Sequence, residues 1–213
     1  MNKLCYFLAF DLGATSGRSI LATLQEGKIC IEELTRFPNR MLRINQQYYW
    51  NIYALFEELE NALCAVVQRN IELSAIGIDT WGVDFVYLAA DGTMIGLPRA
   101  YRDPYTANEI LEQYFTQISR EKIYKTTGIQ IMNINSLFQL YAAKNENSFA
   151  FKSADSILFM PDALIYLLTN KKVCEYSIAS TSQLLNVWNR KFEEELFEPF
   201  GKKTSIIPEL VMP

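Results

Sequence analysis

The order of apolar segments predicts an α/β domain built on a mixed sheet. Three β-type runs rich in isoleucine, phenylalanine and leucine, at residues 4–10, 18–24 and 28–37, are separated by short glycine-containing turns, which predicts an antiparallel meander. A helical pattern follows the meander. The apolar run 73–79 after that helix is too short for a surface helix and favours a buried strand beside the first one.

The helix after the meander has the most regular pattern in the chain. Asn51 is a candidate N-cap, because its side chain can accept a hydrogen bond from the first backbone amides of a helix. The apolar residues that recur at helical spacing are Ile52, Leu55, Phe56, Leu59, Leu63, Val66 and Val67. They predict an amphipathic helix with one buried face.

The second half of the chain alternates extended and helical patterns. Residues 83–97 predict a hairpin with Asp91-Gly92 at its turn, and residues 107–118 and 136–144 predict helices. The apolar run 156–170 contains Pro161, which favours a strand followed by a helix with proline near its first turn. A last helix is expected at about residues 191–200.

Composition favours small-molecule chemistry over nucleic-acid binding. The formal net charge of the 213 residues is −4, whereas binding to phosphate backbones needs an excess of lysine and arginine. The chain contains no histidine, and its four cysteines form no Cys-x-x-Cys pair. A histidine base is therefore excluded from these residues, and a zinc site is disfavoured.

The sequence shows no pattern of a membrane or secreted protein. Asp11 interrupts the N-terminal apolar run too early for a signal peptide, and no stretch of about 18 apolar residues occurs. Widely spaced cysteines fit a reducing compartment. We therefore expect a cytoplasmic protein that does not bind a membrane.

The turn at residues 11–18 is a candidate phosphate loop. Its two glycines permit close backbone approaches, so that consecutive amides can face an anion, and Thr15 and Ser16 add hydroxyl donors. Asp11 can hold Mg²⁺, directly or through water, and the metal would neutralise phosphate charge. A solvated hairpin turn uses the same residue types, and the segment matches neither the P-loop nor the Rossmann pattern.

The segment 77–88 is a candidate sugar site. Trp81 and Gly82 stand between Asp79 and Asp84, directly after a predicted strand, and ligands of open α/β sheets bind at such strand ends. An aromatic ring beside a carboxylate suits a sugar, whose C–H face packs on rings and whose hydroxyls need acceptors. A bulged strand with Trp81 in the core explains the same residues.

Two later segments are weaker candidates. Arg102 and Asp103, between two prolines, can grip hydroxyls in a pocket, or can form a surface pair worth about 0–1 kcal/mol. Residues 174–189 are rich in small hydroxyl side chains and could line a cleft, although a hairpin or a helix start has the same composition.

Taken together, these segments resemble the N-terminal domain of the FGGY family of carbohydrate kinases in content and in order. The matching segments are "FDLGATSGR", "GIDTWGVDFV", "YRDPYT", "GIQIMNINSLFQLYA", "LFMPDALIYLLT" and "EYSIASTSQLLN". The resemblance covers nearly all 213 residues. Within the family, "DLGATSGR", "IGIDTWGVDFVYL" and "GLPRAYRD" resemble in particular the rhamnulokinase branch.

The resemblance implies a fold and a reaction. The fold is the ribonuclease H-like fold of the actin, hexokinase and Hsp70 ATPases. It has a mixed five-stranded sheet flanked by helices, and the first three strands of the sheet are antiparallel. Members of the family bind ATP and a ketose in a cleft between two domains of this kind, and a sugar hydroxyl attacks the γ-phosphate. In the rhamnulokinase branch the product is L-rhamnulose 1-phosphate.

The resemblance also assigns roles by position. The phosphate loop falls on Ala14, Thr15, Ser16, Gly17 and Arg18, and the acid associated with Mg²⁺ falls on Asp11. The sugar-contacting turn falls on Gly82 with Trp81 and Asp84 beside it, and Arg102 and Asp103 are weaker sugar candidates.

By the same resemblance, residues 1–213 form the N-terminal sugar-binding domain, a single domain with insertions. A second, ATP-binding domain and a Gly-His-Asp-Thr segment, whose aspartate is the general base, are expected outside this chain. We therefore expect negligible kinase activity from residues 1–213 alone, and robust ATP-dependent phosphorylation of L-rhamnulose by them would contradict this. The exposed inter-domain face of such a fragment could also form a dimer.

Two kinds of alternative remain open. The full protein could be another kinase of the family, acting on L-fuculose or D-xylulose. From a different class, the fold could serve a sugar-sensing regulator, an actin-like filament or a chaperone module. A regulator is expected to carry a DNA-binding helical element, whereas this acidic chain enters its first strand by residue 4, and a filament or chaperone would lack the Trp-Gly-Val-Asp and Tyr-Arg-Asp features.

Overall fold

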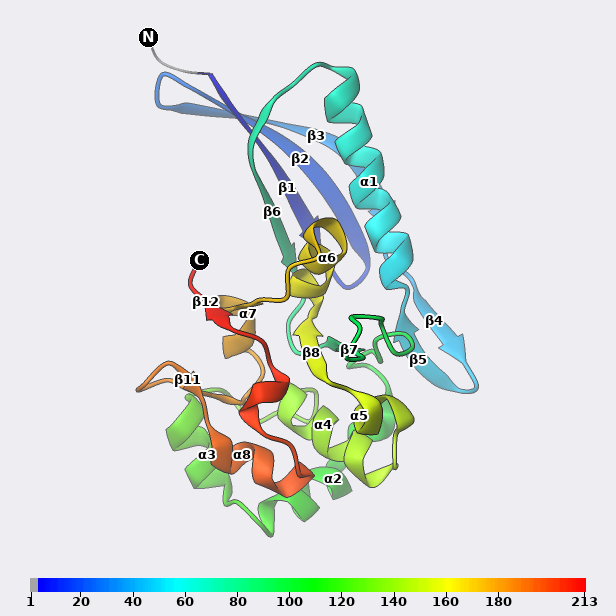
Figure 1. Cartoon of the computed structure of the whole chain (residues 1–213), viewed down its shortest axis with the longest axis vertical. Coiled ribbons are helices and arrows are strands. Elements are labelled where there is room, and N and C mark those ends of the chain that lie inside the picture. Colours follow the sequence, from blue (N-terminus) through cyan, green and yellow to red (C-terminus); the bar gives the residue numbers. More distant parts are fainter. Residues whose placement is uncertain (1–3) are drawn as a thin grey trace. The chain divides into compact units, whose positions relative to one another are not determined.

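The computed structural model describes residues 4–213, which form two compact units (Figure 1). The first unit comprises the chain up to Leu42 together with Asn51–Trp81, and the second comprises Arg43–Trp50 together with Gly82–Pro213. A short stretch from the first half of the sequence, residues 43–50, thus belongs to the unit that the second half builds.

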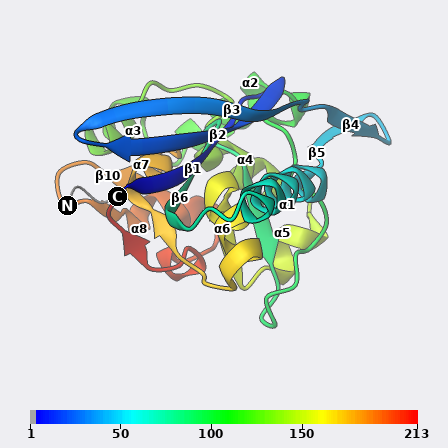
Figure 2. The ribbon, with the colours of Figure 1, turned by 90° about the horizontal axis from the view of Figure 1, so that it is seen from above.

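A four-stranded mixed sheet forms the frame of the first unit. Its strands lie in the order β3-β2-β1-β6. Their bounds are Cys5–Leu12 for β1, Ser16–Gln25 for β2, Lys28–Pro38 for β3 and Leu73–Thr80 for β6. Strand β1 pairs antiparallel with β2 and parallel with β6, and Figure 2 shows β1, β2 and β3 side by side. The predicted antiparallel meander and the parallel strand beside β1 are confirmed.

Two details of the predicted sheet are wrong. The sheet has four strands in the described residues instead of five, because the next strand, β7 (Phe85–Leu88), pairs with β8 (Ser156–Phe159) in the second unit. Strand β6 is also not buried: its residues 74–77 are exposed. The physical reason is that β6 lies at an edge of this sheet and has a neighbouring strand on one side only.

Helix α1 (Ile52–Gln68) is the one long helix of the first unit and contacts β3 (Figure 1). The Asn51 carbonyl oxygen Oδ1 accepts a hydrogen bond from the Ala54 amide at 3.2 Å, which confirms the predicted N-cap. The buried residues of the helix are Ile52, Leu55, Leu59, Ala62 and Val66. Val67 is 71% exposed, so the apolar face is narrower than the sequence pattern predicts.

The second unit contains short strands and most of the helices. Strand β5 (Gln47–Trp50) lies in this unit, and the boundary between the units falls within β4 (Met41–Ile44), after Leu42. The helices are α2 (Asn108–Phe115), α3 (Arg120–Thr127), α4 (Ser136–Asn145), α5 (Phe149–Ser153), α6 (Met160–Thr169), α7 (Tyr176–Ser180) and α8 (Glu194–Phe197), with 3-10 turns η1 (Pro104–Thr106), η2 (Glu198–Phe200) and η3 (Thr204–Ile206). The short strands are β9 (Cys174–Glu175), β10 (Leu185–Asn186), β11 (Lys191–Phe192) and β12 (Leu210–Val211).

The core of the second unit is centred on α4. Its residues from Ser136 to Ala143 are all buried, and the edges of its aromatic rings meet Tyr114 of α2. The centroid of the Tyr114 ring lies 5.7 Å from that of Phe138 and 5.2 Å from that of Tyr141, both edge to face. A helix that is buried on all sides shows no amphipathic stripe, yet its predicted bounds agree with the structure.

Other predictions for the second unit are confirmed in part. The turn at Asp91-Gly92 exists, with the Thr93 amide donating to Asp91 Oδ1 at 2.9 Å, but β8 and not the other arm of the turn is the main partner of β7. The strand and Pro161-containing helix of 156–170 are confirmed as β8 and α6. The expected helix 191–200 is instead β11, one turn of α8 and the 3-10 turn η2, because Pro199 interrupts helical hydrogen bonding.

Within residues 4–213, no helix is both long enough and apolar enough to cross a lipid bilayer.

Candidate functional site

The loop between β1 and β2 presents hydrogen-bond donors to solvent. Two of its carbonyls face Asn39, which donates its amide to Thr15 O and its side-chain Nδ2 to Gly13 O, both at 2.9 Å. In the part of the chain that the structure describes, no hydrogen bond engages the amides of Ala14 and Thr15 or the hydroxyls of Thr15 and Ser16. Amides and hydroxyls grouped in this way suit the oxygens of a phosphate.

The two glycines of this loop are explained by close packing. Neither is among the residues with positive φ. A Cβ on Gly17 would lie 2.4 Å from Cε2 of Phe37, and a Cβ on Gly13 would lie 3.1 Å from the carbonyl oxygen of Ser16. Gly17 therefore keeps space for the buried Phe37 ring, and Gly13 keeps the turn tight.

Asp11 and Arg18 form an ion pair across β1 and β2. The two are cross-strand partners, and Arg18 donates Nε to Asp11 Oδ2 at 2.8 Å, with Nη2 at 2.7 Å from the same oxygen. Both side chains are about half exposed. Asp79 is the partner of Asp11 in the parallel pairing with β6, so a second carboxylate stands one strand away. Sequence reasoning cannot give this register, and it missed Asp79 as a neighbour of Asp11.

The turn at Gly82–Asp84 has a rare backbone conformation. Val83 has a φ of +70°, and the Asp84 amide donates to Gly82 O at 3.0 Å across it. These are the features of the strained γ-turn whose central residue has φ near +75°. A β-branched residue in this region is an outlier, and such strain persists only where the surroundings hold it.

Three side chains of the second unit hold the γ-turn in place. The Val83 amide donates to Thr181 Oγ1 at 3.2 Å. Its carbonyl accepts from Ser136 Oγ at 2.6 Å and from Gln139 Nε2 at 3.2 Å. The lack of a side chain at Gly82 is part of this arrangement, because a Cβ there would lie 2.9 Å from Thr181 Oγ1.

Asp84 lies at the centre of this network and not on an open surface. It is 1% exposed, and its carboxylate accepts from Trp50 Nε1 at 2.5 Å, from the Tyr101 amide at 3.1 Å and from Gln139 Nε2 at 2.9 Å. Three donors, two of them side chains, thus fix this carboxylate. Its position supports a role in shaping the turn that follows Gly82.

The remaining predicted sugar residues differ in exposure. Asp103 is 3% exposed and accepts from the Tyr48 amide at 2.7 Å and from Arg99 Nη2 at 2.9 Å, so it is part of the internal scaffold. Arg102 is exposed and donates Nε only to the adjacent Tyr101 hydroxyl at 3.2 Å. Trp81 and Gly82 are partly exposed. Of the predicted sugar contacts, Trp81, Gly82 and Arg102 are therefore the accessible ones.

The residues that hold the γ-turn were not predicted. Thr181 lies in the hydroxyl-rich segment 174–189, which composition and the family resemblance both singled out without giving Thr181 a role. Ser136 and Gln139 lie in a segment that was predicted as a helix and that carries part of the family resemblance, but neither residue was given a role. Their role depends on contacts between residues 53 to 98 positions apart in the chain, which no local pattern encodes.

Comparison with known proteins finds relatives over nearly the whole chain. The model of the N-terminal domain of the FGGY family of carbohydrate kinases matches residues 6–212. A rhamnulokinase of Bacteroides thetaiotaomicron is 47% identical over 207 residues, which are 97% of this chain and 42% of that protein. A rhamnulokinase of Oceanobacillus iheyensis is 39% identical over 206 residues, which are 97% of this chain and 44% of that protein. The chain thus spans less than half the length of these curated relatives.

Solved structures of sugar kinases share the fold. A ligand-bound xylulose kinase from Lactobacillus acidophilus superimposes with a TM-score of 0.85 at 18% identity, over 98% of this chain and 42% of that one. A Plasmodium falciparum glycerol kinase with ADP superimposes with a TM-score of 0.77 at 16% identity, over 97% of this chain and 43% of that one. The expected fold is confirmed.

Proposed function

The chain belongs to the FGGY family of carbohydrate kinases, and on that basis we propose that it is the sugar-binding part of a kinase that transfers the γ-phosphoryl group of ATP to L-rhamnulose. Identity of 47% to a rhamnulokinase over nearly the whole chain supports this ketose. The β1–β2 loop, with its amide and hydroxyl donors beside Asp11, is the observation that carries the phosphoryl-transfer chemistry.

On the phosphate side, the proposed contacts are the amides and hydroxyls of the β1–β2 loop and the Arg18 guanidinium. The full set is Ala14, Thr15, Ser16, Gly17 and Arg18. The Arg18 side chain pairs with Asp11 and is about half exposed, so its guanidinium is accessible to phosphate oxygens. Two carboxylates, Asp11 and Asp79, on adjacent strands form an oxygen donor set that fits Mg²⁺, directly or through water. When bound, Mg²⁺ would neutralise phosphate charge.

The described residues contain no group of three or more His, Cys, Asp or Glu side chains placed to hold a metal. We propose that the two carboxylates hold Mg²⁺ mainly through water and substrate phosphates, which is usual for this ion. In this arrangement Asp11 would bind the metal and Arg18 would contact the phosphates of the nucleotide. Both contacts require the ion pair between Asp11 and Arg18 to open.

On the sugar side, we propose that Gly82, Trp81 and Arg102 contact the ketose, while Asp84 and Asp103 hold those groups in position. The γ-turn is rigid because side chains fix both the amide and the carbonyl of Val83. A rigid backbone beside the sugar lowers the entropy lost when the reacting hydroxyl is oriented. This role fits the burial of Asp84 and Asp103 better than direct contact does.

For the whole protein we propose the organisation that the family resemblance implies. Residues 1–213 act as one N-terminal sugar-binding domain with insertions, and the general base and adenosine site are supplied by the portion of the relatives that this chain does not span. We also propose that the protein acts in the cytoplasm. Self-association through an apolar face remains a further prediction.

The test is a ketose panel with the full-length protein. We expect MgATP-dependent phosphorylation with the highest kcat/KM for L-rhamnulose, ahead of L-fuculose and D-xylulose. A higher kcat/KM for either of the other ketoses would replace the proposed substrate with that sugar. No phosphorylation of any ketose would overturn the kinase and favour a sugar-sensing role.

A further inference from the structure

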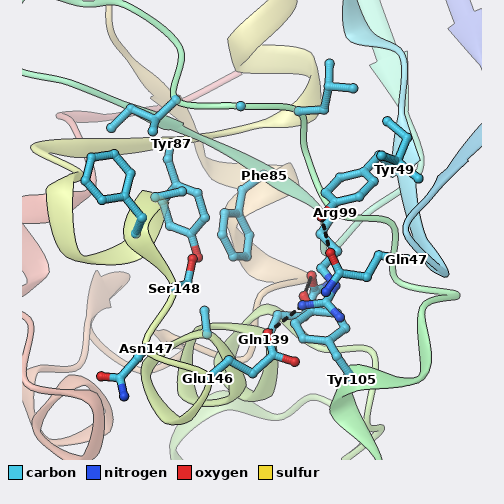
Figure 3. Close-up of a pocket in the computed structure, with 17 residues that line it drawn as sticks. Gln47, Tyr49, Phe85, Tyr87, Arg99, Tyr105, Gln139, Glu146, Asn147 and Ser148 are labelled. Atoms are coloured by element: carbon cyan, nitrogen blue, oxygen red, sulfur yellow. Dashed lines mark hydrogen bonds and ion pairs between the residues drawn. The ribbon is translucent and has the colours of Figure 1, made fainter.

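The second unit contains a cavity of about 610 Å³ that the proposed phosphate and sugar contacts do not use. This volume lies within the range of about 300–1,000 Å³ that small-molecule sites occupy. Figure 3 shows the rings of Phe85 and Tyr87 projecting into it, with Arg99 and Tyr105 on one side and Asn147 and Ser148 on the other. All of its lining residues belong to the second unit.

The floor of the cavity is apolar and rigid. Phe85 is 5% exposed and Ala143 is 6% exposed, and the ring of Tyr87 meets that of Phe85 edge to face at 5.3 Å. Gln139 also lines the floor, but its amide is fully engaged: Nε2 donates to Asp84 Oδ1, and Oε1 accepts from the Tyr105 hydroxyl at 2.6 Å. Both polar atoms of the Gln139 amide are therefore occupied, so this residue shapes the floor of the cavity but does not hydrogen-bond a ligand.

The charges in the cavity exclude an anion. Arg99 is its one cation among the lining residues, and it already pairs with Glu146 at 2.6 Å and with Asp103 at 2.9 Å. Burial by itself would lower the pKa of Arg99, but these two hydrogen bonds outweigh it and raise the pKa. Two carboxylates thus face one guanidinium, and Glu146 is 41% exposed at the rim, where it would repel a phosphate.

The remaining polar groups of the cavity can form hydrogen bonds with the hydroxyls of a ligand. The Tyr87 hydroxyl makes no hydrogen bond within residues 4–213, and burial raises its pKa, so it stays protonated at neutral pH. Arg99 engages only Oε2 of Glu146, which leaves Oε1 as an acceptor. The Gln47 carbonyl accepts from the Tyr49 hydroxyl, which leaves its Nε2 as a donor. Asn147 adds an exposed amide.

We propose that this cavity is a second small-molecule site that takes a neutral sugar or sugar-like polyol. An aromatic floor matches the C–H face of such a molecule, donors and acceptors at the wall match its hydroxyls, and the carboxylate at the rim rejects its phosphate esters. The site is separate from the γ-turn contacts, although Gln139 borders both.

The experiment uses residues 1–213 and saturation-transfer NMR with matched probes: D-glucose, L-rhamnose and glucose 6-phosphate at millimolar concentration. We expect saturation transfer to a neutral sugar and none to the phosphate ester. Tyr87→Phe removes one hydroxyl and keeps the ring, and it should weaken binding by roughly three- to ten-fold. Glu146→Gln should allow glucose 6-phosphate to bind.

Arg102→Ala, in the proposed substrate site, separates this proposal from the proposed function. We expect this variant to bind the neutral sugar as the wild type does. Loss of binding in Arg102→Ala with no change in Tyr87→Phe would place the sugar at the γ-turn and overturn the second site. Absence of any signal from the neutral sugars, or equal binding of the phosphate ester, would also overturn it.

Discussion

At the scale of single residues, the strained γ-turn at Val83 depends on side chains from distant parts of the chain. A valine with φ of +70° is unfavourable by itself, by about 1–3 kcal/mol, and persists here because Thr181, Ser136 and Gln139 bind its amide and carbonyl. Gly82 leaves room for Thr181, because a Cβ on Gly82 would lie 2.9 Å from Thr181 Oγ1. The backbone conformation of Val83, next to the proposed sugar contact Gly82, thus depends on the side chain of Thr181, 98 positions later in the chain.

Gly82→Ala should destabilise the protein and loosen the turn. The added Cβ would lie 2.9 Å from Thr181 Oγ1, so we expect a loss of about 1–3 kcal/mol in the free energy of unfolding. Urea unfolding measures the loss, and hydrogen exchange of the Val83 amide reports the turn.

Gly77→Ala is the matched control, because a Cβ at Gly77 meets nothing within 4 Å. We expect that variant to be as stable as the wild type. Equal stabilities of Gly82→Ala and Gly77→Ala would show that contact with Thr181 does not constrain the turn.

Asp162, in the first turn of α6, should make stability depend on pH. It is fully buried, Oδ1 accepts from the Glu175 amide at 3.2 Å, and Oδ2 has no partner in the described part of the chain. Burial raises its pKa from the ordinary 3.8 to about 7. The folded state therefore holds the proton more tightly than the unfolded state, and this stabilisation is complete below about pH 4 and lost as the pH rises through 7.

The difference in unfolding free energy between wild type and Asp162→Asn isolates this effect. We expect it to change by an amount on the order of 4 kcal/mol between pH 4 and pH 8, with the wild type losing stability relative to the variant. Asp155→Asn, which removes an exposed carboxyl outside α6, is the matched control for the substitution itself. A constant difference across this range for Asp162→Asn would contradict a raised pKa.

At the scale of elements, local patterns predict type and order well, but partners poorly. The N-cap at Asn51, the three meander strands and the proline in the first turn of α6 follow from short segments. The main partner of β7 does not: its hairpin turn at Asp91-Gly92 forms, yet its ladder is with β8, about 70 residues later. Tertiary packing overrides the local signal there.

The β1–β2–β3 meander should be sensitive to any side chain at Gly17. A Cβ there would lie 2.4 Å from the ring of Phe37, so we expect Gly17→Ala to lower the free energy of unfolding by about 1–3 kcal/mol. The Gly17→Ala/Phe37→Leu double variant should lose less than the sum of the single losses, because leucine leaves room for the methyl group. Strictly additive losses in urea unfolding would show that the two residues do not compete for space.

At the scale of the whole molecule, the folded chain comprises two compact units, and one of them takes residues from two separate parts of the sequence. Residues 43–50 belong to the second unit through hydrogen bonds such as those of Trp50 with Asp84 and Tyr48 with Asp103, which no composition shift announces. The first unit leaves β3 at the edge of its sheet, with Ile29 69% and Ile31 72% exposed. An apolar edge strand can pair with another chain.

We therefore expect residues 1–213 to self-associate at high concentration in sedimentation velocity, and Ile31→Lys to reduce that association, because a lysine on an edge strand opposes pairing. Val67→Lys is the matched control, at an apolar residue of α1 that is 71% exposed. Equal association of the two variants would remove β3 as the contact.

The sequence by itself determined the local elements and their functional groups, because these depend on neighbours within a few residues. They are the strand-loop-strand with its hydroxyls, the capped amphipathic helix and the Trp-Gly-Val-Asp turn. Only the tertiary structure decided which groups are accessible. Asp84 and Asp103 are enclosed by Trp50, Arg99 and Gln139, and Gly17 and Gly82 leave room for Phe37 and Thr181. The physical reason is that burial and close packing join residues far apart in the chain.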